Sequence, residues 1–141
     1  MVRVTKAFSA LGFWLALFAA PAHAADAAPP EVRALIERQL DAFAHDDAEG
    51  AYALAAPGIK ALFSDSDTFM AMVRNSYAPV YRHRSVEFGD FALEGEKVEQ
   101  ALTIVDEDNR VWTAIYLLER QPDGTWKTTG CLLTKAGQSS L

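Results

Sequence analysis

The hydrophobic repeat of the chain changes from a helical period to a strand period near residue 85, and this change constrains the fold more than any other feature. Upstream, apolar side chains recur three or four positions apart, as they do along one face of a helix. Downstream, they recur at every second position in runs separated by turn residues, which is typical of strands. Since helices come first and strands second, the sequence predicts an α+β domain with helices on one face of an antiparallel sheet.

Three helices are predicted ahead of the sheet. The first has a proline in its first turn, at Pro30, and an amphipathic stripe that includes Leu35 and Ile36. Asp46 and Asp47 offer a break and an N-cap before an alanine-rich second helix. The predicted segments are a helix over 30–45, a helix over 48–56 stopped by Pro57-Gly58, a short helical turn over 59–63, a helix that follows the capping residues 64–67 and ends near Asn75, and an extended connector over 77–84 that Pro79 makes rigid.

Four strands are predicted after the connector. They cover Ser85–Leu93, Val98–Val105, Val111–Glu119 and Trp126–Thr134. The short loops between them force neighbouring strands to run antiparallel. The last loop has Pro122 and Gly124 at the positions that a type I turn favours.

The third predicted strand is apolar on both faces. One face carries Trp112, Ala114, Tyr116 and Leu118, and the other carries Val111, Thr113, Ile115 and Leu117. A sheet with one face in water alternates apolar and polar residues. We therefore expect the second face to be covered by a partner subunit, a terminal segment or a ligand, and a homodimer through the sheet is the favoured arrangement.

The first 24 residues are predicted to be a cleaved signal peptide. Arg3 and Lys6 precede an uncharged apolar run, and Ala22-His23-Ala24 supplies small residues for cleavage. The run is shorter than the roughly 20 apolar residues that a membrane span needs. The expected divisions are a signal peptide over 1–24, a leader over 25–30, one domain over 31–135 and a tail over 136–141. The mature protein is expected in the periplasm or secreted, without stable membrane insertion.

The charge of the chain argues against two classes of partner. The 141 residues contain 13 Lys and Arg against 19 Asp and Glu, for a net charge of −6. Loss of the signal peptide removes two cations and no acid, which makes the mature charge −8. A domain this acidic lacks the positive field that nucleic acids and anionic membranes require.

The single cysteine, Cys131, excludes an intramolecular disulfide and is expected to be a buried core residue.

No catalytic or metal motif is evident in the sequence. His45 is placed to complement the negative end of the first helix. His83 lies between two arginines and is a candidate general base, but no nucleophile stands at motif spacing. Asp65 and Asp67 fit helix capping better than a calcium loop. We expect neither a metal nor a cofactor.

The basic residues around the connector form a candidate ligand site. Arginine forks bind carboxylate or phosphate groups, and tyrosine adds hydroxyl donors. The alternative is that these arginines pair with the surplus carboxylates of the domain. Aromatic residues of the third strand can form the wall of an apolar pocket. The candidate binding residues are Arg74, Tyr77, Tyr81, Arg82, His83, Arg84, Trp112 and Tyr116.

The order of elements and the final Gly124-Thr125-Trp126-Lys127 segment resemble the cone-shaped fold of nuclear transport factor 2-like proteins. The chain more specifically resembles exported bacterial proteins catalogued as domain of unknown function 4864. The residues that carry this resemblance are Gln39-Leu40-Asp41-Ala42-Phe43, Pro57-Gly58-Ile59, 67–73, 77–82, Ser85-Val86-Glu87-Phe88-Gly89, 119–124 and Thr129-Gly130-Cys131. The resemblance implies three helices on a curved sheet around an apolar pocket, and it implies no catalytic residue.

Three functions remain open at the level of sequence. The favoured one is a non-enzymatic domain that binds a small apolar or anionic ligand in a pocket with a Tyr/Arg rim. The second is an assembly or adaptor module that docks through its sheet. The third is a cofactor-free cone-fold enzyme that uses His83 or His45 as a base.

Overall fold

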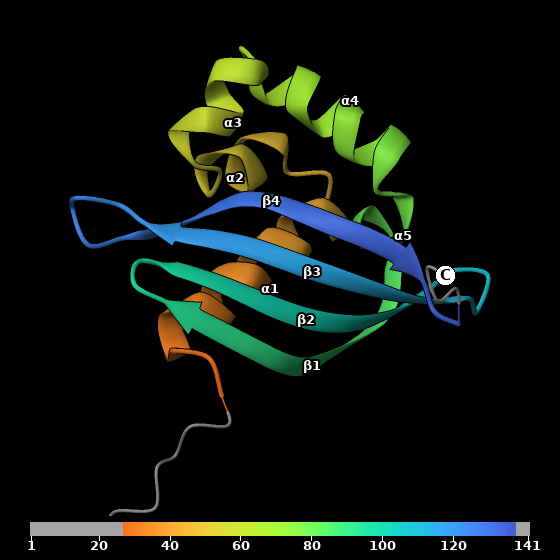
Figure 1. Cartoon of the computed structure of the whole chain (residues 1–141). Coiled ribbons are helices and arrows are strands. Elements are labelled where there is room, and N and C mark those ends of the chain that lie inside the picture. Colours follow the sequence, from red (N-terminus) through yellow and green to blue (C-terminus); the bar gives the residue numbers. More distant parts are fainter. Residues whose placement is uncertain (1–26, 138–141) are drawn as a thin grey trace, which may run out of the picture.

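A computed structural model describes residues 27–137 as helices followed by strands, so the predicted α+β class is confirmed (Figure 1). The elements are α1 (Pro30–Ala44), α2 (Ala48–Ala53), α3 (Pro57–Leu62), α4 (Ser66–Ser76), α5 (Ala78–Tyr81), β1 (His83–Glu94), β2 (Lys97–Asp106), β3 (Val111–Arg120) and β4 (Trp126–Lys135). The predicted signal peptide lies outside the described residues. Within those residues, no helix is long and apolar enough to cross a membrane.

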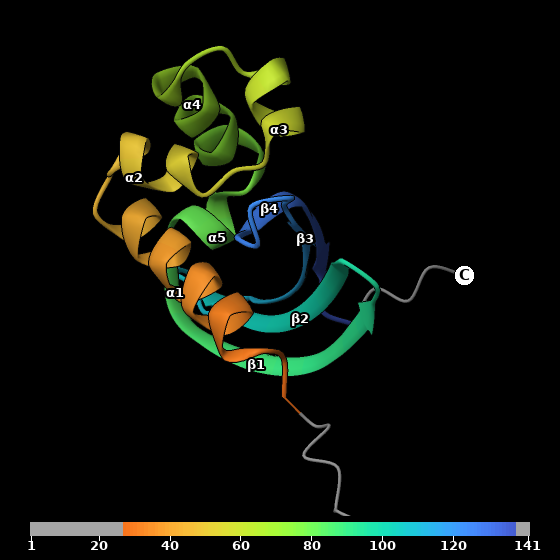
Figure 2. The same cartoon turned by 90° about the vertical axis from the view of Figure 1, so that its left-hand side faces the viewer.

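The four strands form an antiparallel meander in the order β1-β2-β3-β4. The helices lie on one face of this sheet, which curves around α1 and α5 (Figure 2). The predicted turn between β3 and β4 is present, because the Gly124 N–H donates to the Gln121 carbonyl at 2.8 Å. This strand order leaves β1 and β4 as the two edges of the sheet.

The first helix forms where the sequence places it and supplies much of the core. Pro30 occupies the first turn, and the buried stripe of α1 includes Val32, Ile36 and Phe43. The same stripe carries one buried amide, Gln39, which is 1% exposed. Its side chain donates to the Ala51 carbonyl and accepts from the Thr128 hydroxyl, so the amide joins α1 to α2 and β4.

The prediction of three helices was wrong, because the described chain has five. The helix expected over 48–56 ends at Ala53, and Pro57, which was expected to stop it, begins α3, since a proline fits the first turn, where its missing N–H leaves no bond unmade. Most of the helical turn predicted over 59–63 lies within α3. The extended connector also contains a helix, α5, with Pro79 in its first turn. Tyr77 both ends α4 and precedes α5, so the chain bends between two helices at this residue.

The structure shows which face of the sheet meets the helices. Ala114, Tyr116 and Leu118 point into the core and are at most 2% exposed. The opposite face carries Ile115, Leu117 and, on the neighbouring strands, Ala101 and Leu132, and no segment within residues 27–137 packs over it (Figures 1 and 2). Leu132 is 58% exposed on that face. The predicted apolar second face therefore exists, and what covers it stays a prediction.

Candidate functional site

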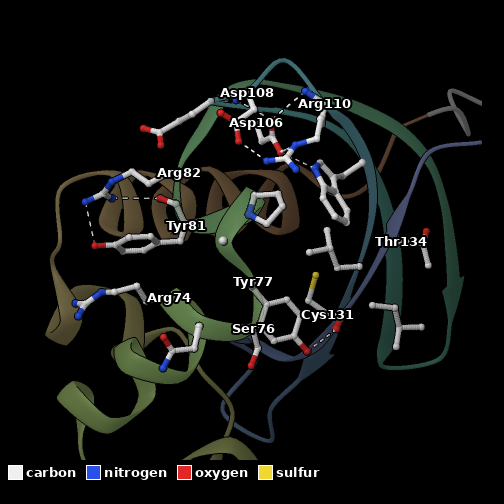
Figure 3. A pocket seen from close by; sticks show the side chains of 17 residues that line it. Arg74, Ser76, Tyr77, Tyr81, Arg82, Asp106, Asp108, Arg110, Cys131 and Thr134 are labelled. Carbon is white, nitrogen blue, oxygen red and sulfur yellow. Dashed lines mark hydrogen bonds and ion pairs between the residues drawn. The ribbon is translucent and has the colours of Figure 1, made fainter.

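A large open pocket lies beside β4, and we call it the main pocket (Figure 3). Its volume is about 930 Å³. Three parts of the chain form its walls, namely the end of α4 with α5, the β2–β3 hairpin, and the second half of β4. The lining residues are 74–79, Tyr81, Arg82, Asp106, Glu107, Asp108, Arg110, Trp112 and 131–134.

One wall is fixed by a corner of three side chains, Asp46, Tyr81 and Arg82. The Tyr81 hydroxyl donates to one Asp46 carboxylate oxygen, and the Arg82 guanidinium donates to the other at 2.7 Å. Arg82 also donates to the Phe43 carbonyl at 2.7 Å and lies 3.9 Å from the centre of the Tyr81 ring. The hydrogen bond from Tyr81 is the main reason that the pKa of Asp46 is lowered. This corner ties the α1–α2 turn to α5.

A second wall is organised by the buried carboxylate of Asp106. Its oxygens accept hydrogen bonds from the Trp112 indole at 2.8 Å and from the backbone N–H groups of Asp108 and Arg110, both at 2.9 Å. Burial alone raises the pKa of Asp106, but the bonds from Trp112 and the two N–H groups outweigh it, so the pKa is lowered overall. Asp106 is therefore an anion, and in this form it holds the indole of Trp112 in the pocket wall.

Three arginines line the main pocket, and two of them are already paired. Arg82 pairs with Asp46, and Arg110 pairs with carboxylates of its own hairpin. The side chain of Arg74 forms neither a hydrogen bond nor a salt bridge within residues 27–137. It is exposed, and its guanidinium carbon lies 5.5 Å from the centre of the Tyr81 ring (Figure 3). The pocket thus offers one arginine whose charge is not neutralised by a contacting carboxylate of the described chain.

A smaller space lies behind the main pocket, and we call it the inner cavity. Its volume is about 70 Å³, and its walls are mainly apolar. Tyr77 and Cys131 line both spaces, and the Tyr77 hydroxyl donates to the Cys131 carbonyl at 3.0 Å. Burial raises the pKa of the Cys131 thiol to about 12. Tyr116 also lines the inner cavity, and burial, together with the nearby Cys131 thiol, raises the pKa of its hydroxyl. Both groups are neutral at pH 7.

The structure brings most of the candidate binding residues together. Arg74, Tyr77, Tyr81, Arg82 and Trp112 all line the main pocket. Tyr116 is buried behind it.

The remaining two candidates lie elsewhere. His83 and Arg84 line a shallow pocket between α1 and β1. His83 contacts the Val80 carbonyl through Nδ1 at 3.1 Å, and Arg84 donates to the Asn109 side chain at 2.6 Å. His45 caps the end of α1, where its Nδ1 lies 2.9 Å from the Asp41 carbonyl. The lining residues of the main pocket, all drawn from the described chain, include no histidine.

Sequence reasoning missed the hairpin and strand residues of the pocket. Residues 106–109 were interpreted only as a charged hairpin turn, and neither Arg110 nor residues 131–134 were predicted to line a pocket. The pairing of Trp112 with Lys135 brings the end of β4 next to the β2–β3 hairpin. An antiparallel register counted outward from the turn between β3 and β4 would have indicated that these two segments are neighbours. No group of three or more potential metal ligands occurs within residues 27–137.

The fold and the pocket define a small helix-covered α+β domain with a large open pocket beside one edge of its antiparallel sheet. The chain belongs to the family described as domain of unknown function DUF4864, whose model matches residues 25–140. The match includes every described residue, so the resemblance to this family is confirmed. No curated protein matches the chain.

Proposed function

We propose that this domain binds, without catalysis, a ligand that combines an apolar body with a negatively charged group, and that the main pocket is the binding site. The observation that carries the proposal is the composition of the pocket walls. Trp112, Leu133 and Pro79 provide apolar surface, and Arg74 stands at the rim without a contacting carboxylate. Pockets of several hundred Å³ with apolar walls and a few polar groups are the usual sites for small ligands.

The chemistry of the pocket favours binding over catalysis. A histidine base must reach the substrate proton within hydrogen-bond distance. His45 and His83 both lie outside the main pocket. The thiol of Cys131 does line it, but burial raises its pKa to about 12, and a thiol that stays protonated is a poor nucleophile.

The proposal includes a fold class and a compartment. We assign the curved sheet and its helices to the cone of nuclear transport factor 2-like proteins, and we place the mature domain in the periplasm or outside the cell after removal of residues 1–24. The support for the cone is the helix-first order and the curvature around α1 (Figure 2). Fold class alone does not define a function.

Titration with the dye 8-anilinonaphthalene-1-sulfonate tests the proposal, because this probe joins aromatic rings to a fixed negative charge. The Arg74→Gln variant should bind the dye about tenfold more weakly, the scale of one charge-assisted hydrogen bond. The matched control is Lys97→Gln, which makes the same change of charge at an exposed residue outside the main pocket and should leave the affinity unchanged. Equal affinities of the two variants, or no saturable binding to the purified wild type, would contradict the proposal.

Docking through the sheet is a second candidate function. It is favoured by the uncovered apolar face that contains Ile115, Leu117 and Leu132. Leu132 also lines the main pocket, but Ile115 and Leu117 do not, so variants of those two residues test docking separately from ligand binding.

A further inference from the structure

The main pocket runs along the backbone edge of β4. Its lining includes Cys131, Leu132, Leu133 and Thr134, which are consecutive. Side chains of a strand alternate between the two faces of a sheet, so four residues in a row can border one pocket only from the edge of the strand. β4 is an edge strand of the sheet, which agrees with this geometry.

The first half of this edge is already paired. Ala55 forms a parallel bridge with Thr128. The Thr128 N–H donates to the Leu54 carbonyl at 2.9 Å, and the Ala56 N–H donates to the Thr128 carbonyl at 2.8 Å. The domain therefore adds a short extended segment of its own to β4 before the pocket begins.

The second half of the edge is partly unpaired, because Tyr77 binds the Cys131 carbonyl whereas the backbone groups of Leu133 stay free within residues 27–137. The Cys131 carbonyl points away from β3, because it accepts from the Tyr77 hydroxyl. The Ala136 N–H points toward β3, because it donates to the Val111 carbonyl. The ladder alternates, so the N–H and C=O of Leu133 face the same way as those of Cys131. Neither Leu133 group has a hydrogen-bond partner within residues 27–137.

We propose that the ligand of the main pocket is an extended peptide segment of a partner protein, which adds a strand to the edge of β4 from Leu132 to Lys135, beyond the Cys131 carbonyl that Tyr77 already binds. This inference rests on the proposed function and names the class of ligand. At about 3.3 Å per residue, the four edge residues match a segment of about four residues. Free strand edges commonly take up peptides in this way, with affinity that comes from backbone hydrogen bonds.

The walls of the pocket favour a single peptide strand over a second copy of the whole domain. Residues 74–79 stand opposite the edge and limit the pocket to about 930 Å³. A two-fold pairing of β4 with its own copy would bring that same wall of each copy against the other. Arg74 and Glu107, which both line the pocket and form no salt bridge within the described chain, can receive acidic and basic side chains of a peptide.

The test begins with a library of capped hexapeptides, randomised at every position, screened against the purified protein. The best binder is then made in two N-methylated forms that carry the methyl groups on alternate residues. An added strand turns every second N–H toward β4, so one form should lose at least about tenfold in affinity and the other should keep it. Equal affinity of the two forms, or a library without a binder, would overturn the inference.

Two protein variants test the backbone hydrogen bonds between the peptide and β4 by changing Leu133 instead of the peptide. Leu133→Pro removes the outward N–H, a change that an edge strand tolerates, whereas Leu133→Ala removes the side chain and keeps the N–H. Leu133→Ala removes apolar surface of the main pocket and should itself weaken peptide binding. Leu133→Pro removes the N–H as well and should weaken binding at least about tenfold further, so equal losses in the two variants would contradict the added strand. This comparison requires that circular dichroism shows the proline variant folded; if it does not fold, the methylated peptides decide. If the dye binds saturably and through Arg74 but no peptide binds, the peptide inference is rejected and the proposed function is kept. If neither the dye nor a peptide binds, both the peptide inference and the proposed function are rejected.

Discussion

At the scale of single residues, Asp106 organises the wall of the main pocket. It is 7% exposed, yet three donors satisfy it, one of them the indole of Trp112. A buried carboxylate with this many donors is stable as an anion, because each hydrogen bond favours the charged form. The position of the indole in the pocket thus depends on the charge of Asp106.

We predict that the Asp106→Asn variant melts at a lower temperature than wild type at pH 7. This gap in melting temperature between the two proteins should narrow in acid. The pKa of Asp106 is below its ordinary value of 3.8 in the folded protein, so the folded state binds this proton less readily than the unfolded state. The resulting stability is complete above the unfolded pKa and is lost as the pH falls through the lower folded pKa. Melting curves between pH 7 and about pH 3 measure the gap. A gap that stays constant below pH 4 would show that the charge of Asp106 contributes no stability.

The thiol of Cys131 should react slowly with Ellman's reagent at pH 8. Its pKa of about 12, against an ordinary value of 9.0, makes the thiolate fraction roughly a thousandfold smaller than in an exposed cysteine. We expect the folded protein to react at least about a hundredfold more slowly than the same protein in guanidinium chloride. Similar rates in both states would mean that the thiol is not held in an apolar setting.

At the scale of elements, the strands and most of the helices were predictable, and the four-residue α5 was not. The four predicted strands differ from the observed ones by at most two residues at either end, because turn residues such as Gly95 and Gly124 separate the apolar runs. α5 has four residues, which is too short for a hydrophobic repeat to show. Its proline fits a rigid connector and a first helical turn equally well, so local sequence could not distinguish them.

We predict that Arg82 and Arg84 contribute unequally to stability, although they are two residues apart. Arg82→Gln should destabilise the domain by about 1–2 kcal/mol, because it removes the bonds to the Phe43 carbonyl and to Asp46 that join α5 to the α1–α2 turn. Arg84→Gln removes one exposed bond to Asn109 and should cost less than about 0.5 kcal/mol. Urea unfolding of both variants measures the difference, and equal losses would contradict this role of Arg82.

At the scale of the whole molecule, the site combines segments that the sequence keeps far apart. Sequence reasoning found the arginines and tyrosines of residues 74–82 because they cluster along the chain. It also placed His83 and Arg84 with them, but the start of β1 carries both residues to the other side of α5, toward α1. The edge of β4 was not found, because its part in the pocket depends on strand order and on the bulge that shifts its register near Leu118.

The uncovered face of the sheet leads us to predict a homodimer. Replacing Ile115 and Leu117 with Glu should halve the mass measured by light scattering, because charges placed in an apolar interface oppose its burial. Leu62→Glu is the matched control, since Leu62 is 78% exposed on α3, away from the sheet face. A wild-type protein that is monomeric at micromolar concentration would contradict the dimer. Trp112 and Tyr116 are unsuitable for this test, because they lie on the helix-covered face.

The central claim is that the main pocket is the binding site. Amide shifts of the nitrogen-15-labelled protein, recorded by NMR during titration with 8-anilinonaphthalene-1-sulfonate, test this claim most directly. We predict saturable shifts in residues 74–82, in the β2–β3 hairpin and in residues 131–134, with one affinity for all three segments. Shifts confined to the uncovered sheet face around Ile115, or to the pocket of His83 and Arg84, would contradict it.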